Sequence, residues 1–361
     1  MNDLETRVRV ALRDLADETD RSSGPGHMPK PFRRRVLRRR AGTATVAALA
    51  TGAVIAAAVV GVQWLGRGTT AQPANHPTTA PHVNGAFAIA RHDGIYEVQP
   101  DGSGLQKVTD CPLPDCDGTA SPAWSPDGSK IVFAALPKEG GAGEGLFVID
   151  ADGSGLARLT DCAPPGCGED WDPAWSPDGS KIVFTRLGKG PLDQATIELY
   201  VVNADGSGLG RLADLPGYAE TPAWSPDGGR IAFDLQDENG QRIEVIRADG
   251  SHRSVIFQEP PGSGPGAPAW SPDGSRIAFV MAGAEGNPDI FVMNADGSHA
   301  TRMTTDPSPD VDPVWSPDGS KIAFVRTGSG GELFVMDADG GNAHLVMKDV
   351  LGMSWQALPE R

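Results

Sequence analysis

The stretch Pro173-Ala174-Trp175-Ser176-Pro177-Asp178-Gly179-Ser180-Lys181-Ile182-Val183-Phe184 is one copy of a phrase that decides the fold. Its core, Trp-Ser-Pro-Asp-Gly, recurs at Trp124, Trp175, Trp224, Trp270 and Trp315, and a degenerate sixth copy is Ser354-Trp355-Gln356. The tryptophans are 51, 49, 46, 45 and 40 residues apart. A self-similar period of about 40–50 residues indicates a solenoid, a propeller or another repeat array.

Each repeat carries the signals of four short β-strands. In the copy at Trp175 these are residues 174–176, 182–185, 199–202 and 210–212, which are rich in β-branched and aromatic residues. Ser-Pro-Asp-Gly between the first two strands has the composition of a type I turn. A second turn phrase, ending in Asp-Gly, separates strands three and four at Asp101, Asp152, Asp205, Asp249, Asp296 and Asp339. Four antiparallel strands per unit are typical of one propeller blade.

The two ends of the array predict how the propeller closes. The repeats begin at Gly85–Ala90, which resembles a second strand without a preceding first strand. The final copy, Gly352–Trp355, supplies that missing strand. We therefore predict an all-β, six-bladed β-propeller over residues 85–361, in which the C-terminal strand completes the first blade. Such closure leaves no open sheet edge that could pair with other chains.

The repeated phrase Pro-x-Trp-Ser-Pro-Asp-Gly-x-(Lys/Arg)-Ile-(Ala/Val)-Phe, followed by (Asn/Asp)-Ala-Asp-Gly, resembles the TolB-type, WD40-like propeller repeat. The resemblance covers residues 85–357. It implies a role in interactions of the bacterial cell envelope, although the α/β domain that precedes the propeller in TolB has no counterpart here. Similar repeats also form the propeller of prolyl oligopeptidase-like peptidases, where a hydrolase domain accompanies it.

The N-terminal 84 residues predict a membrane anchor. Ala41–Leu65 is a run of 25 residues without charge, long enough to span a bilayer. Six arginines in Arg33–Arg40 precede it and place the N-terminus in the cytoplasm by the positive-inside rule. Residues 66–84 are Thr- and Pro-rich and predict an extended linker. A cleaved signal peptide is the alternative.

Residues 1–40 form the expected cytoplasmic segment. Within them, residues 3–18 have apolar positions at helical spacing, which indicates a short amphipathic helix. Such a helix can lie on the inner membrane surface or dock a cytosolic partner. We therefore expect a single-pass protein of the cell membrane with an extracytoplasmic propeller.

Charge argues against one class of partner. The chain carries a net charge of −16, and residues 1–40 hold 11 Lys and Arg against 6 Asp and Glu. The remaining 321 residues therefore hold 20 basic and 41 acidic residues. Because nucleic-acid phosphates are bound by Lys and Arg, so acidic a propeller is not expected to bind nucleic acid.

Four cysteines fall into two similarly placed pairs. We predict local disulfides Cys111–Cys116 and Cys162–Cys167, because an even count outside the cytoplasm favours disulfides. A shared four-sulfur zinc site is the alternative. The spacing of Asp150, Asp152 and Ser154 is similar to that of a calcium-binding EF-hand loop, but strands flank it and a hairpin turn explains it. We expect no metal and no cofactor.

The variable loops predict the binding face. Loops between strands two and three, and between blades, should share one face and differ from copy to copy, as in 136–145, 187–197, 162–172 and 258–268. Variable loops on a rigid scaffold usually carry function. The candidate residues lie just before the inner strands, although they could equally be solvated loop residues: Ser121, Trp171, Asp172, Glu220, Thr221, Asp310 and Asp312. The repeated tryptophans are more consistent with packing between blades than with sugar stacking.

The sequence favours a binding protein over an enzyme. It has no Gly-x-Ser-x-Gly elbow, and its seven histidines are scattered. We therefore expect an envelope protein or a small ligand as the partner of the loop-rich face. Two alternatives remain open. One is a transmembrane regulator of the anti-sigma type that signals through residues 3–18. The other is an envelope carbohydrate-binding protein or a lyase, an activity known among TolB-like propellers.

Overall fold

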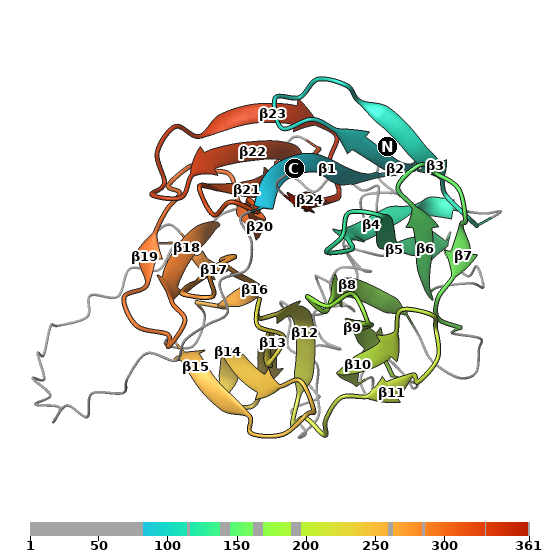
Figure 1. Ribbon diagram of the computed structural model, residues 1–361. Helices are drawn as coiled ribbons and strands as arrows, with labels where there is room; N and C mark the ends of the chain where they lie inside the picture. Colours follow the sequence, from blue (N-terminus) through green and yellow to red (C-terminus); the bar gives the residue numbers. More distant parts are fainter. Residues whose placement is uncertain are drawn as a thin grey trace, which may run out of the picture. The chain divides into compact units, whose positions relative to one another are not determined.

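The computed structural model describes residues 82–113, 116–137, 145–161, 169–188, 196–258, 263–283, 286–328 and 330–359. These residues form six four-stranded antiparallel sheets arranged around a common centre (Figure 1). The predicted six-bladed propeller is therefore confirmed. The predicted segments 1–40 and 41–65, and residues 66–81 of the linker, lie outside the described residues. Within the described ranges, no helix is long and apolar enough to cross a membrane.

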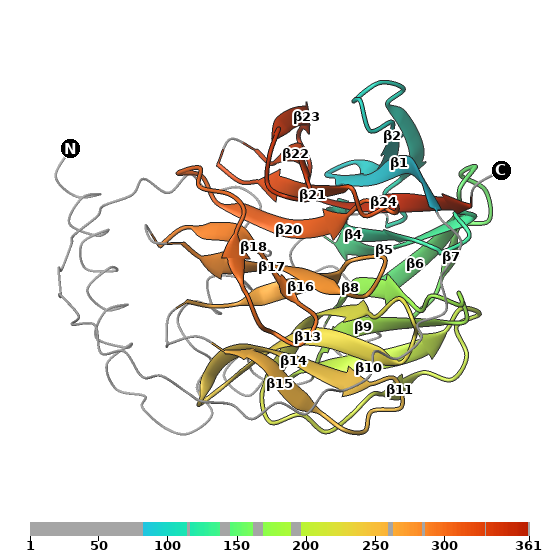
Figure 2. The same cartoon turned by 60° about the vertical axis from the view of Figure 1, so that its left-hand side comes forward.

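The first blade joins the two ends of the array, as predicted. It contains β24 (Gly352–Pro359), β1 (His82–Arg91), β2 (Gly94–Val98) and β3 (Gln106–Asp110), in that order from the inside outward. The strand β1 begins three residues before the predicted boundary at residue 85. Figure 2 shows β1 and β24 side by side, and their register pairs Phe87 with Trp355.

The other five blades follow the chain. The second contains β4 (Cys116–Trp124), β5 (Lys130–Pro137), β6 (Gly145–Asp150) and β7 (Ala157–Arg158), and the third β8 (Asp170–Trp175), β9 (Lys181–Leu187), β10 (Ile197–Asn203) and β11 (Gly210–Arg211). The fourth contains β12 (Tyr218–Trp224), β13 (Arg230–Asp237), β14 (Gly240–Arg247) and β15 (Ser254–Gln258). The fifth contains β16 (Gly266–Trp270), β17 (Arg276–Ala282), β18 (Pro288–Asn294) and β19 (Thr301–Arg302), and the sixth β20 (Asp310–Trp315), β21 (Lys321–Arg326), β22 (Glu332–Asp337) and β23 (His344–Lys348).

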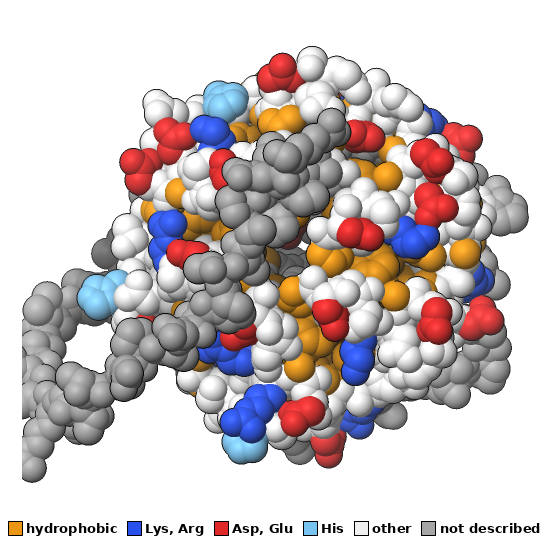
Figure 3. Space-filling view, viewed as in Figure 1, with side chains coloured by type: hydrophobic (Ala, Val, Ile, Leu, Met, Phe, Trp, Pro, Cys, Tyr) orange, Lys and Arg blue, Asp and Glu red, His pale blue; other side chains and the backbone are white. Residues whose placement is uncertain are grey.

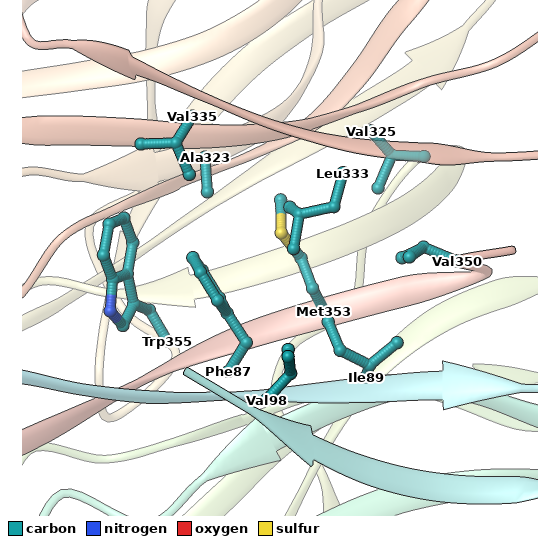
Figure 4. Packing of buried hydrophobic residues seen from close by; sticks show 10 residues of the cluster. All are labelled: Phe87, Ile89, Val98, Ala323, Val325, Leu333, Val335, Val350, Met353 and Trp355. Carbon is teal, nitrogen blue, oxygen red and sulfur yellow. The ribbon is translucent and has the colours of Figure 1, made fainter. Parts of the chain in front are cut away.

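The hydrophobic core lies between neighbouring blades. At the closure, Phe87 and Trp355 of the first blade pack with Val325 and Leu333 of the sixth blade (Figure 4). The rings of Phe87 and Trp355 are 4.4 Å apart between centroids. Because each blade buries apolar side chains against the next, the strand added by the C-terminus is held by packing as well as by backbone hydrogen bonds.

The repeated tryptophans belong to these inter-blade contacts, as predicted. Trp315 packs among residues of both the fifth and the sixth blade. Its indole Nε1 donates to the carbonyl oxygen of Ala269, in the first strand of the preceding blade, at 3.1 Å. Trp175 makes the equivalent bond to Ala123 at 3.1 Å. Trp175 and Trp315 therefore each couple two consecutive inner strands.

The Ser-Pro-Asp-Gly turns are stabilised by their own side chains. In the third blade the Ser176 hydroxyl donates to Asp178 at 2.6 Å and accepts the backbone N–H of Lys181 at 2.9 Å. Asp178 also accepts the backbone N–H of Ser180. The same bonds recur in the second and sixth blades, so this phrase encodes a preformed turn.

The Asp-Gly phrase has a second role, in contacts between blades. Its glycines have positive φ, for example +87° at Gly297. In addition, each Cα lies against a backbone carbonyl of the preceding blade's fourth strand, or of the residue directly after that strand. A Cβ on Gly297 would lie 1.7 Å from the carbonyl oxygen of Ile256, and one on Gly206 would lie 3.3 Å from that of Leu159. Glycine is therefore required both by the turn and by the neighbouring blade.

The topology assigns the turns and loops to two faces. The Ser-Pro-Asp-Gly and Asp-Gly turns lie on one face, which we call the turn face. The connections between strands two and three, and between blades, lie on the opposite face, which we call the loop face. The closing blade has no Ser-Pro-Asp-Gly turn. Instead, Asn84 bonds to Asp318 at 2.9 Å and Gln356 bonds to the carbonyl of Gly128 at 3.1 Å.

Candidate functional site

A β-bulge interrupts the first strand of five blades at the same position. The pairing with the second strand shifts there, for example between Trp171 and Ala174. The bulged residue precedes a proline, lies three residues before the repeated tryptophan, and has a φ between +47° and +54°. We call these five residues the bulge ring: Ser121, Asp172, Thr221, Ala267 and Asp312.

Positive φ is costly for residues other than glycine, roughly 1–3 kcal/mol each. Such strain is often found at ligand sites, although a repeated bulge can also be purely architectural. The first strand of each blade lines the centre of the propeller, and the bulge lies toward its loop-face end. The bulge ring therefore surrounds the loop-face mouth of the central channel.

Members of the bulge ring contact one another across a blade boundary. The Ser121 hydroxyl donates to Asp172 Oδ1 at 2.7 Å. Both side chains are half-buried, whereas Asp312 is exposed. The ring therefore presents two carboxylates and two hydroxyls around the channel mouth, and Ala267 is its one apolar member. Figure 3 shows the opposite, turn face, where apolar side chains gather around the central opening and charged side chains are spread over the rim.

The fourth blade adds two buried acids below the ring. Glu220 and Asp234 lie directly opposite each other on β12 and β13, and are 5% and 1% exposed. The Thr221 hydroxyl donates to Asp234 Oδ1, and the Gln241 amide donates to Asp234 Oδ2 at 3.1 Å. Gly266 of the next blade leaves space for this group, since a Cβ there would lie 3.2 Å from Gln241 Nε2 and 3.3 Å from Asp234 Cγ.

Buried ion pairs brace the loop-face ends of two other blades. Asp170 is bound by both Nε and Nη2 of Arg186, at 2.6 and 2.7 Å, and also accepts the hydroxyl of Thr160. Asp310 is bound in the same way by Arg326, at 2.7 and 3.0 Å. Hydrogen bonding to Asp310 raises the pKa of Arg326, so the guanidinium stays charged. These bonds fix the base of the loops that follow.

The fifth blade also holds a buried carboxylate that is paired with an arginine. Burial raises the pKa of Asp289, while Arg302, at 2.7 Å, opposes that shift. Thr304 also donates to Asp289. Asp289 begins the third strand rather than the first, so it braces the outer part of the blade.

The structure separates the predicted binding residues into two groups. Ser121, Asp172, Thr221 and Asp312 all belong to the bulge ring. The other three are buried: Trp171 is 6%, Glu220 5% and Asp310 0% exposed. Glu220 lies beside Asp234, and Asp310 is bound to Arg326. A binding role for any of the seven residues remains a prediction.

Two residues of this region were not among the predicted ones. Ala267 was missed because alanine carries no chemical signal, although its place before Pro268 and three residues before Trp270 could have revealed it. Asp234 was missed because it lies in a second strand. An alignment of the repeats could have revealed it, because this position is an acid only in the fourth blade. The equivalent positions in the other described blades hold Ala90, Ala134, Thr185, Val280 and Val325.

Only one of the four cysteines has a described side chain. Cys111 is disulfide-bonded, and no described cysteine is free. The side chains of its expected partner Cys116 and of the second pair lie outside the described residues, so both pairings remain predictions. Among the described residues, no three His, Cys, Asp or Glu side chains are grouped so that they could hold a metal ion.

Comparison with known families decides the identity of the repeat. The model of the TolB beta propeller domain matches residues 115–258 and 193–355, which together make up most of the chain. This chain belongs to the TolB β-propeller family. Its family membership thus rests on the repeats themselves, as the resemblance of the Trp-Ser-Pro-Asp-Gly phrase implied.

Solved structures agree with this fold. TolB from Acinetobacter baumannii superimposes with a TM-score of 0.62 at 20% identity, over 75% of this chain and 66% of that one. A chain of a nidogen/laminin complex gives a TM-score of 0.60 at 13% identity, over 76% of this chain and 99% of that one. At such identities the likeness shows the fold alone.

One curated relative carries a peptidase name. An uncharacterized peptidase of Bacillus subtilis, YuxL, is 35% identical over 102 residues. The match covers 27% of this TolB-family chain and 13% of YuxL. The chain therefore spans only a small part of that relative's length.

Proposed function

We propose that this protein is a membrane-anchored, extracytoplasmic binding module whose loop face binds a protein or a small ligand of the cell envelope. The observation that supports this most is the bulge ring. Five of the six inner strands hold a strained residue at one position around the channel mouth, and four of these five side chains are polar. The proposal assigns no catalytic residue.

The chemistry of the ring favours a partner with a cationic group. Asp172 is half-buried and Asp312 exposed, and the buried Glu220 and Asp234 lie close to the ring in the fourth blade. A lysine or arginine side chain entering the mouth would meet carboxylates in partly desolvated surroundings, where charge-assisted hydrogen bonds are strong. The membrane anchor of the proposal is residues 41–65, by their length and lack of charge.

The test is affinity capture with the full-length protein in detergent. Wild-type protein is compared with the double variant D172N/D312N, which removes both ring carboxylates at nearly constant volume. The matched control is E238Q, which removes one exposed carboxylate on the same face, in the turn between β13 and β14. We expect one envelope protein to be captured by the wild type and by E238Q, and to be lost from the double variant.

Two results would count against the proposal. Equal capture by the double variant would show that the carboxylates of the bulge ring do not take part in binding. If no protein is captured, a thermal-shift screen of cationic small molecules follows, with the same three proteins. Stabilisation of the wild type alone would identify a small ligand, and no stabilisation by any compound would refute binding at this face.

A further inference from the structure

The described chain enters and leaves the propeller on the turn face. The strand β1 starts at His82, which pairs with Pro359 at the end of β24. Two residues later, Asn84 bonds to Asp318, which lies in the Ser-Pro-Asp-Gly turn between β20 and β21. From there β1 runs to Arg91 and its turn into β2, on the loop face. Any tether N-terminal to His82 is therefore attached to the turn face.

We propose that the turn face is the side nearest the membrane, and that the loop face with its bulge ring points away from it. This inference rests on the proposed anchor at residues 41–65. A partner would then reach the channel mouth from the far side of the propeller, without competing with lipid for the same surface.

The length of the tether supports this orientation. Sixteen residues separate Leu65 from His82, and sixteen residues span at most about 55 Å. A blade is about 26 Å high, as judged from the eight residues of β14 at about 3.3 Å each. To invert the propeller, the tether would have to pass two outer strands and then climb a whole blade. That path takes roughly 36 Å of the tether at the spacings of a β-sheet, about two thirds of its full reach, whereas the upright orientation takes none of it.

The charge of the turn face argues against direct adhesion to anionic lipid. The two turn phrases place eleven aspartates on this face, and seven basic residues lie in or directly beside those turns. Hydrogen bonds from serine hydroxyls lower the pKa of Asp152 and Asp205, among others, so these groups stay ionised. Electrostatic repulsion acts over about 8 Å at physiological salt. The tether is long enough to hold the propeller beyond that distance.

The experiment measures how far each face lies from the bilayer. Arg247 is the last residue of β14, near the turn face, and Glu238 lies in the turn just before β14, on the loop face; both are exposed. The full-length variants R247C and E238C are labelled with a fluorescent donor and placed in phosphatidylcholine nanodiscs that carry headgroup acceptors. Labelled wild type measures background reaction of the four native cysteines.

We expect stronger energy transfer from R247C than from E238C, because its donor should lie up to about 26 Å nearer the bilayer. Equal transfer from both variants, or stronger transfer from E238C, would overturn the orientation while the anchor still holds. Carbonate extraction of the same protein from liposomes tests the anchor separately. Release of the protein would refute the anchor, and the orientation with it.

Discussion

The contact between each Asp-Gly turn and the preceding blade makes a quantitative prediction about stability. The perturbation is the replacement of one turn glycine by alanine. At Gly297 the new Cβ would lie 1.7 Å from the carbonyl oxygen of Ile256, far inside van der Waals contact. At Gly206 the equivalent distance is 3.3 Å, which a small shift can relieve. Both glycines have nearly the same φ, +87° and +85°.

The magnitude follows from two separable costs. Alanine at positive φ costs roughly 1–2 kcal/mol at either site. Replacing glycine also reduces the freedom of the unfolded chain, which returns about 0.4–1 kcal/mol at either site. Only G297A must in addition displace the backbone of β15, and overpacking of this kind costs about 1–3 kcal/mol. G297A should therefore be destabilised by about 2 kcal/mol more than G206A.

The assay is thermal unfolding of the full-length variants, followed by near-ultraviolet circular dichroism. A difference of about 2 kcal/mol corresponds to a Tm difference of roughly 4–8 °C for a domain of this size. G286A is the baseline, because Gly286 has φ +79° and a Cβ there would meet no atom within 4 Å. Equal losses in all three variants would show that only the backbone conformation matters, and that the inter-blade contact does not.

Three further changes test other parts of the fold. R186A should cost about 3–5 kcal/mol, measured by urea unfolding, because it leaves Asp170 buried and unpaired by arginine. Hydrogen bonding from Ser176 lowers the pKa of Asp178. This pair therefore adds stability that is present above about pH 4 and is lost as pH falls through the lowered pKa, so S176A should flatten the loss of stability below about pH 4. A267G should raise stability by up to about 1 kcal/mol, since Ala267 has a φ of +50°.

Each of these predictions has its own contrary outcome. A loss below 1 kcal/mol for R186A, as expected for the exposed pair Lys107–Asp110 in a K107A control, would mean that burial adds nothing to the Asp170 pair. If S176A loses stability below about pH 4 as steeply as the wild type, the serine is not the cause of the pKa shift of Asp178. A loss of stability in A267G would show that the bulge is not strained there.

Local physics explains why the fold could be predicted. A Ser-Pro-Asp-Gly turn closes on its own hydrogen bonds within six residues, as between Ser176 and Lys181, so its sequence alone indicates it. The closing strand could be recognised from the repeat as well. The last copy of the phrase, at Trp355, supplies a first strand that is not followed by a second, third and fourth strand. What these features share is that the residues that make them are close in sequence or repeated.

The candidate site depends on contacts that no local pattern contains. Asp310 was expected on the binding surface because it precedes an inner strand, but its carboxylate is fully buried and is bound by Arg326, 16 residues later. The bond between Ser121 and Asp172 spans 51 residues and a blade boundary. Contacts of this kind require the register of each sheet and the order of the blades, which the sequence pattern does not specify.

Departures from the repeat are the best guide to what is specific to this protein. The residue just before the bulge pairs with the second strand in the five bulged blades. In four of them the pair combines small, apolar or uncharged residues, such as Ala120 with Ala134 and Val311 with Val325. In the fourth blade the same position holds Glu220 and Asp234. This pair of acids departs from the repeat, and it lies beside the bulge ring. We therefore assign it to the proposed partner site rather than to the repeat.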